Sequence, residues 1–175
     1  SNGELGDGTT TAKASLGVTV QSGWVEHIVA EGDAQITVNP PSGAVALVWD
    51  ADTSAAGVQG GNGVWDLTSP NWQLLSTNVP WANVGAGYEA QFPPVTSGLA
   101  TVQLSNTDLI QSCRLTFATG GNGTGYILLN GTLSLGQNAI VDVPGYVEIG
   151  SSIQGVNGLM KLGNGVLILR GANTY

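Results

Sequence analysis

Short apolar runs at nearly even spacing fill the second half of the sequence. They begin with YILL at Tyr126, TLSL at Thr132, AIVD at Ala139, YVEI at Tyr146, LMKL at Leu159 and VLIL at Val166. The steps between them are six, seven, seven, thirteen and seven residues, and SSIQ lies inside the step of thirteen. Runs of about four residues are too short for stable isolated hairpins. They suit the sides of a β-solenoid, whose stacked coils bury a continuous core.

Three such sides make a coil of roughly 20 residues. The spacing predicts an inward-facing apolar ladder made of Leu128, Leu133, Leu135, Ile140, Val147, Ile149, Met160, Leu162, Leu167 and Leu169. Gly and Asn lie between the runs, where both residues accept the positive φ of a sharp corner. An antiparallel β-sandwich is the alternative, but the spacing is more even than hairpins require.

The first half of the chain has a different texture. Four runs rich in Val and Ile, ASLGVTV, GWVEHIVA, AQITV and AVALVW, are separated by Gly, Asp or Pro-Pro and predict strands. The sequence therefore divides into a flexible arm (1–13), an N-terminal β cap or small β module (14–50), a Trp-rich capping or junction segment (51–98) and solenoid coils (99–175).

Four of the five tryptophans, Trp49, Trp65, Trp72 and Trp81, fall within 33 positions. Two interpretations are open. The indoles could seal the open end of the solenoid, which any unclosed coil requires. Alternatively, Trp65, Trp72 and Trp81 could form a flat platform for sugar rings, with hydrogen bonds from Asp66, Asn71 and Asn83. We favour sealing.

Composition and charge exclude several classes of protein. The net charge is −8, and residues 1–100 hold nine acidic side chains against Lys13 alone, so nucleic-acid binding is not expected. No stretch of about 18 apolar residues could span a bilayer. Residues 1–20 carry no signal-peptide pattern. Because the polar, Lys-poor composition is typical of bacterial surface proteins, we expect a secreted chain whose signal has been removed.

Asp50, Asp52 and Asp66 form the best carboxylate cluster and are weak candidates for calcium. The stretch beginning at Asp50 starts like a calcium loop, yet Ala55 stands at the glycine position and Gly61 at that of the closing Glu. Aspartates that bond their own turns are the favoured interpretation. No resident metal or cofactor is expected.

Catalytic interpretations find little support in the sequence. Asp142 and Glu148 invite a glycosidase hypothesis, but neighbouring sides of a solenoid point apart, whereas the two carboxyls must flank one sugar. His27 with Glu26 or Asp33 lacks a nucleophile motif. We therefore predict that the protein is not an enzyme.

The single cysteine and two glycosylation-type motifs also have structural interpretations. Cys113 lies in an apolar run and is expected to be a small buried hydrophobe. Asn122-Gly-Thr and Asn130-Gly-Thr satisfy the N-glycosylation pattern, but Asn-Gly turns are the favoured interpretation.

The run GLMKLGNGVLILRGANTY (158–175) resembles the autotransporter-associated β-strand repeat of bacterial surface proteins. The matching residues are Gly158, Leu159, Lys161, Gly163, Gly165, Leu167, Leu169 and Gly171 to Tyr175. LVWDADTSAAGVQGGNGVWDLTSPNWQ resembles the segment that opens many such proteins, so the resemblance covers about residues 46–175. It implies a right-handed parallel β-helix outside the cell, acting as a stalk, adhesin or fibre without catalysis.

These observations predict an all-β extracellular structural protein, a stalk or fibre subunit of a bacterial surface. Its expected partners are further repeats of a longer chain or copies of itself, joined through open solenoid ends or an N-terminal strand. The alternative is an adhesin or glycan-binding module that uses the Trp-rich segment to hold surface glycans, and a polysaccharide-cleaving enzyme is the less favoured third.

Overall fold

The computed structural model describes residues 26–28, 36–38, 44–84, 87–155 and 158–175. The chain divides into two compact units, Ser1–Ser42 and Gly43–Tyr175. In the first unit, β1 (Glu26–Ile28) and β2 (Ile36–Val38) form an antiparallel pair inside two of the predicted N-terminal runs. The predicted arm at 1–13 and the predicted strand at 14–20 lie outside the described residues.

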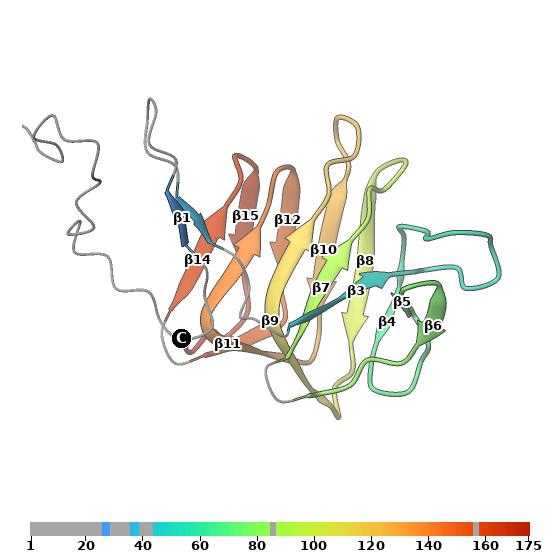
Figure 1. Cartoon of the computed structure of the whole chain (residues 1–175), viewed down its shortest axis with the longest axis horizontal. Coiled ribbons are helices and arrows are strands. Elements are labelled where there is room, and N and C mark those ends of the chain that lie inside the picture. Colours follow the sequence, from blue (N-terminus) through green and yellow to red (C-terminus); the bar gives the residue numbers. More distant parts are fainter. Residues whose placement is uncertain (1–25, 29–35, 39–43, 85–86, 156–157) are drawn as a thin grey trace, which may run out of the picture. The chain divides into compact units, whose positions relative to one another are not determined.

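The second unit consists of strands and connecting turns (Figure 1). Its strands are β3 (Val45–Trp49), β4 (Gly63–Trp65), β5 (Trp72–Leu74), β6 (Thr77–Val79), β7 (Tyr88–Phe92), β8 (Leu99–Leu104), β9 (Leu109–Phe117), β10 (Gly125–Leu129), β11 (Thr132–Asp142), β12 (Tyr146–Ile149), β13 (Ser152–Gln154), β14 (Leu159–Leu162) and β15 (Val166–Leu169). One sheet has the order β15-β12-β10-β8-β4, and the other runs β13-β11-β9-β7-β3-β5-β6, with β14 also on β11. The described residues hold no helix that could cross a bilayer.

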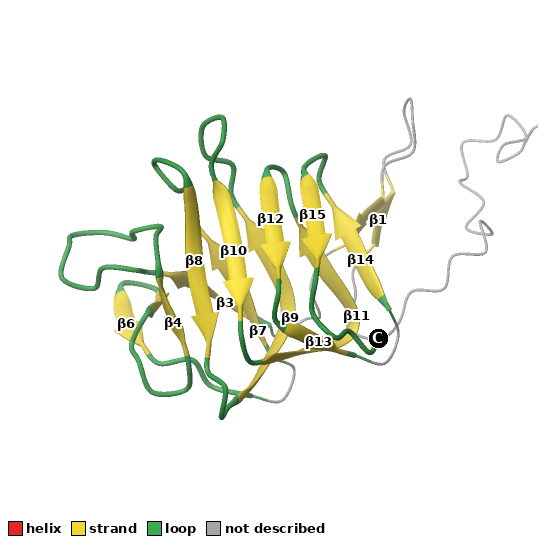
Figure 2. Ribbon diagram, turned by 180° about the vertical axis from the view of Figure 1, so that it is seen from behind, coloured by secondary structure: helices red, strands yellow, loops and turns green. Residues whose placement is uncertain are grey.

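Successive coils stack with their strands parallel. Figure 2 shows β8, β10, β12 and β15 side by side on one face, and each is hydrogen-bonded in parallel to the next. β11 spans two sides of its coil, because its first part pairs with β13 and its second part pairs with β14. The prediction of an all-β parallel solenoid is confirmed.

The length of a coil follows from the register of neighbouring strands. Arg114 lies opposite Ile140, and Ile140 lies opposite Met160, so the step along the chain becomes shorter from one coil to the next. Tyr146 and its partner Val166 are separated by the same step as Ile140 and Met160. The predicted coil length therefore holds for the last coils, whereas the earlier coils are longer.

Most of the predicted ladder lies in the interior. Leu128, Leu133, Leu135, Val147 and Ile149 are buried in the core, and Leu167 and Leu169 pack against it half-buried. In β10 and β12, buried residues alternate with more exposed ones, as expected when one face of a strand meets the opposite sheet.

Three members of the predicted ladder lie on another face. The register places Ile140 between Arg114 and Met160, and in-register neighbours in a parallel sheet share a face. Met160 is 45% exposed, so the prediction that it points inward is wrong. Leu162 lies opposite Asp142, and Ile140 is buried but lies outside the main core. The interior positions of this side of β11 are Ala139 and Val141.

Some corner positions require glycine because φ is positive there. Others require it because neighbouring coils are too close for a Cβ. Gly163 has a φ of 71°, as expected of a corner. Gly165 has no positive φ, but a Cβ there would overlap the carbonyl oxygen of Gly145 in the coil before it. Asn130 and Gly131 have φ values of 63° and 53°, so the predicted Asn-Gly turn is present.

The parallel stack ends at β3. This strand pairs in parallel with β7 on one edge but antiparallel with β5 on the other, and β5 continues antiparallel into β6. β3 belongs to the solenoid sheet, although the sequence analysis grouped it with the N-terminal module.

Candidate functional sites

The tryptophans do not form an exposed platform. Trp65, Trp72 and Trp81 are at most 1% exposed, so the prediction of a glycan platform on these residues is wrong. Trp72 lies at the centre of the cluster, with ring centroids 4.6 Å from Trp81, 4.8 Å from Trp65 and 5.2 Å from Trp49. Aromatic faces and edges saturate one another here, which leaves no face for a sugar ring.

The indole nitrogens of this cluster divide into two kinds. Trp49 Nε1 donates to the carbonyl of Gly61 at 3.0 Å, and Trp81 Nε1 donates to that of Gln111 at 3.1 Å. Among the residues that the structure describes, Trp65 and Trp72 have no hydrogen-bond partner for this nitrogen. The cluster is therefore held mainly by packing, and it fills the interior at the β3–β4–β5 end of the solenoid.

The calcium candidates serve separate turns. Asp50 is 1% exposed and accepts hydrogen bonds from Gln59 N at 3.1 Å and Asn78 Nδ2 at 2.8 Å, which ties its loop to β6. Asp52 accepts from the backbone and side chain of Ser54. Throughout the described ranges, no three His, Cys, Asp or Glu residues gather as a metal site would require. The structure does not bring the candidates together as calcium ligands.

Two of these turn aspartates have lowered pKa values. The side-chain hydrogen bond from Ser54 is the main cause of the lowered pKa of Asp52. Partial burial would raise the pKa of Asp66, but hydrogen bonds from Ser69 and Thr68 together outweigh it and lower that pKa. Both carboxylates are thus stabilised as anions by their own turns, as the sequence analysis favoured.

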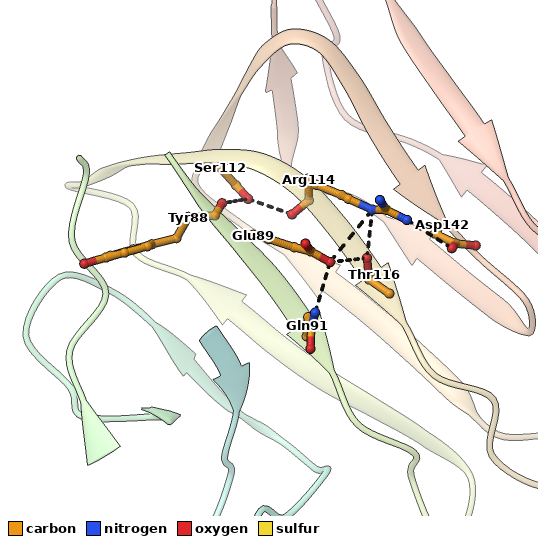
Figure 3. A network of polar contacts seen from close by, with 7 residues as sticks. All are labelled: Tyr88, Glu89, Gln91, Ser112, Arg114, Thr116 and Asp142. Atoms are coloured by element: carbon orange, nitrogen blue, oxygen red, sulfur yellow. Dashed lines mark hydrogen bonds and ion pairs between the residues drawn. The ribbon is translucent and has the colours of Figure 1, made fainter. Parts of the chain in front are cut away.

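A row of polar side chains crosses three coils on the outer face of the larger sheet (Figure 3). Arg114 of β9 lies between two carboxylates, with its Nε 3.8 Å from Glu89 Oε1 of β7 and its Nη2 3.4 Å from Asp142 Oδ2 of β11. Thr116 Oγ1 donates to the same Glu89 oxygen at 2.8 Å, and Gln91 Nε2 donates to it at 3.1 Å. We call Glu89, Arg114, Thr116 and Asp142 the polar ladder.

The polar ladder connects neighbouring coils through ion pairs and hydrogen bonds. Its side chains are 10–29% exposed where they form ion pairs, so they lie in a partly desolvated layer. Each charge faces an opposite charge on the next coil, and Thr116 satisfies both Glu89 and Arg114. Glu89 and Arg114 could not be predicted as partners from the sequence, because they come from different coils.

The two carboxylates considered for a glycosidase and set aside from the sequence, Asp142 and Glu148, lie on different sheets. Asp142 belongs to the polar ladder, whereas Glu148 lies on β12 of the other sheet. Glu148 accepts from Arg170 Nε at 2.6 Å and from Tyr146 Oη at 3.1 Å. The hydrogen bond from Arg170 lowers the pKa of Glu148, and desolvation together with Glu148 raises the pKa of Tyr146.

Cys113 is buried, and burial, followed by the nearby charge of Glu89, raises its pKa to about 11. A thiol in this state is unreactive. His27 lies in β1 of the other unit, opposite Thr37. The part of the chain that the structure describes does not bring a nucleophile and a base together.

An open groove of about 550 Å³ lies on the turn side of the smaller sheet. Its walls are the loop 119–124, which contains three glycines, and the side chains of Leu99, Pro144 and Tyr146. The sequence analysis noted Asn122 only as a turn or glycosylation residue, and it lies in this wall.

The last coil presents an edge. Among the described strands, β14 pairs only with β11 and β15 only with β12. Val166 is 54% exposed there, and Leu167 and Leu169 are only half-buried. This edge has the backbone groups and the apolar surface on which a further coil could stack.

The described strands form a parallel β-solenoid with an aromatic-filled end and, at the last coil, an edge on which none of them pairs. Over 134 residues the chain is 35% identical to the adhesin BmaC autotransporter of Brucella suis biovar 1 (strain 1330). The match takes in 73% of this chain but only 4% of that protein, so the chain spans a small part of its relative. No family model and no solved structure matches the chain. Fold and similarity together support an autotransporter-related β-solenoid.

Proposed function

We propose that this chain is the capped segment of an extracellular passenger domain, a non-enzymatic stalk whose coils carry the rest of a bacterial surface protein away from the membrane. The contrast between its two ends carries the proposal. One end is filled by four buried tryptophans and covered by antiparallel strands. The other presents parallel strands and half-buried leucines in an even register.

The resemblance to the autotransporter-associated β-strand repeat supports this proposal. The residues of that motif fall on the last coil, where Gly163 turns a corner and Gly165 lies against the preceding coil. Coils of this kind could extend the stack in either of two ways. Further repeats of the same chain would lengthen the stalk, and the edge of a second copy would join two stalks end to end.

Duplicating one coil tests the stalk. A second copy of the segment 146–165, inserted after Gly165, preserves the register because Val166 already lies opposite Tyr146. We expect the particle to lengthen by about 4.8 Å, the spacing of neighbouring strands, in small-angle X-ray scattering, with cooperative unfolding retained. The matched control inserts the same segment with its sequence scrambled. Equal behaviour of the two insertions would contradict the stalk.

Two further measurements test location and self-association. Protease should remove the segment from intact bacteria that make the native protein, because a passenger lies outside the cell. Sedimentation at rising concentration tests end-to-end association of the chain, and a monomer at every concentration would limit the edge to coils of the same chain.

Adhesion is a second candidate, since the relative bears the name adhesin. Binding of the purified chain to host-cell surfaces, against a heat-unfolded control, tests it. The buried tryptophans require that any such contact use another surface.

A further inference from the structure

The outer row of the smaller sheet has a gap at its centre. Leu99, Gly125 and Tyr146 follow one another in register across β8, β10 and β12, and in-register neighbours share a face. Leu99 is 45% exposed and Tyr146 is half-exposed, while Gly125 contributes no side chain. The groove of about 550 Å³ includes Leu99 and Tyr146 in its walls, and a smaller hollow of about 30 Å³ reaches Gly125.

Glycine is required between them because neighbouring coils are in close contact at this position. A Cβ on Gly125 would overlap the carbonyl oxygen of Tyr146. Because Gly125 has no side chain, the space between exposed Leu99 and half-exposed Tyr146 stays open along this row. The volume of the groove, about 550 Å³, lies in the range of about 300–1,000 Å³ that is usual for small-molecule sites.

The groove wall combines apolar faces with neutral polar groups. Tyr146, Leu99 and Pro144 supply apolar surface, and Thr119 and Asn122 supply a hydroxyl and an amide. None of the described residues that line the groove carries a charge. A ligand that fits this chemistry is uncharged and carries hydroxyl groups around an apolar ring face. The net charge of −8 further disfavours acidic ligands.

Tyr146 is held in place by a chain of hydrogen bonds. Its Oη donates to Glu148 Oε2 at 3.1 Å, and Glu148 is fixed in turn by Arg170 Nε at 2.6 Å. An aromatic ring anchored by its hydroxyl loses little freedom when a ligand stacks on it, which favours binding.

We propose that this groove binds a neutral carbohydrate, with Tyr146 as the stacking platform and the loop 119–124 as the hydrogen-bonding wall. The site is separate from the buried tryptophans, and it does not depend on the stalk function. A sugar ring on Tyr146 would place its hydroxyl groups beside Asn122 and the exposed backbone of the glycine-rich loop.

The test uses the full chain and an array of oligosaccharides, with each neutral glycan paired with its sialylated form. Calorimetric titration with the neutral glycan that binds best then gives Kd. We expect Tyr146→Ala to weaken binding at least tenfold. Tyr146→Phe keeps the ring and should stay within about threefold, since only the anchor of the platform is lost.

A groove-filling variant locates the site. Gly121 lines the groove and has open space where a Cβ would project, so Gly121→Leu adds bulk to the groove wall without a backbone clash, and it should also weaken binding at least tenfold. Gly136→Leu is the matched control, because a Cβ there makes only ordinary contacts and lies away from the groove. Unfolding midpoints verify that all four variants fold.

Three results would overturn the proposal. They are binding of no neutral glycan, binding of the sialylated forms alone, and neutral-glycan binding that Gly121→Leu leaves unchanged. The coil-duplication experiment reads length and not ligand binding, so the stalk and the groove can fail independently.

Discussion

The interior of the solenoid is filled by different kinds of residue at its two ends. At the β3–β4–β5 end, tryptophans and Phe92 fill the interior, and Phe92 stacks on Phe117 at 4.6 Å. In the last coils, Val147, Ile149 and Ile153 fill it. The coils also become shorter toward this second end, as the register of β9, β11 and β14 shows.

This contrast indicates how a repeat begins. A regular coil is covered above and below by identical neighbours, so medium-sized aliphatic residues suffice to fill it. Among the described strands, the first coil has a parallel neighbour on one side only. Large aromatic side chains and the antiparallel β5–β6 pair replace the second neighbour, and regular coil length is lost there. The aromatic end is therefore the irregular one, and the proposed extension of the stack belongs to the regular end.

Removing the central indole is expected to have the largest effect. Trp72→Ala empties space between Trp49, Trp65 and Trp81, and such truncations cost about 3–5 kcal/mol in the free energy of unfolding. Leu167→Ala, at a half-buried site of the last coil, should cost less than half as much. Urea denaturation measures both.

Leu75→Ala is the control for this comparison, since Leu75 is 92% exposed and its loss should be nearly neutral. Equal losses for Trp72→Ala and Leu167→Ala would mean that the aromatic end is no more important than any other coil.

The polar ladder lies on the coils between the two ends, and breaking it should have the next largest effect. Arg114→Met leaves Glu89 and Asp142 facing each other without the guanidinium. We expect a loss of about 3 kcal/mol, because an uncompensated and mostly buried carboxylate remains. Adding Glu89→Gln should restore part of it. An unrestored double variant would assign the loss to the packing of the Arg114 side chain and not to its charge.

The spacing of the sequence predicts the solenoid because each side of a coil is one short run. YILL, YVEI and VLIL form β10, β12 and β15. Which face points inward is harder to predict where apolar residues are consecutive. In AIVD and LMKL, both faces carry apolar side chains, so periodicity alone could not exclude Met160 from the core.

The polar ladder and the groove are made by residues of different coils. Their alignment depends on the length of each coil, and that length varies along the sequence. Arg114 meets Glu89 of the preceding coil and Asp142 of the following coil at unequal separations along the chain, so no fixed repeat aligns the polar ladder. The groove depends on the loop 119–124 lying beside Leu99 and Tyr146, which come from strands on different coils. The sequence left both sealing and a platform open for the tryptophans, and the platform is excluded only because distant segments meet and bury the indoles.

Substitution of a corner glycine tests how closely the regular coils at the last end are packed. Gly165→Ala would place a Cβ on the carbonyl oxygen of Gly145, and we expect a cost of about 1–3 kcal/mol from the resulting displacement. Gly145→Ala meets open space and is the matched control. If both variants unfold at the same denaturant concentration, the coils are not in close contact at this corner.

Acid should have the smallest effect on stability, and it should destabilise the two ends at different pH values. Hydrogen bonding by Arg170 lowers the pKa of Glu148 below its ordinary 4.5, and hydrogen bonding by Ser54 lowers that of Asp52 below 3.8. A carboxylate with a lowered pKa in the folded state stabilises the fold fully above its unfolded pKa, and this contribution disappears as pH falls through the folded value. Arg170→Gln should therefore reduce the thermal midpoint near neutral pH, and its difference from wild type should shrink below about pH 4.5. Ser54→Ala should behave in the same way, but only below about pH 3.8. Differences that stay constant from pH 7 to pH 3 would show that these hydrogen bonds do not respond to charge at either end.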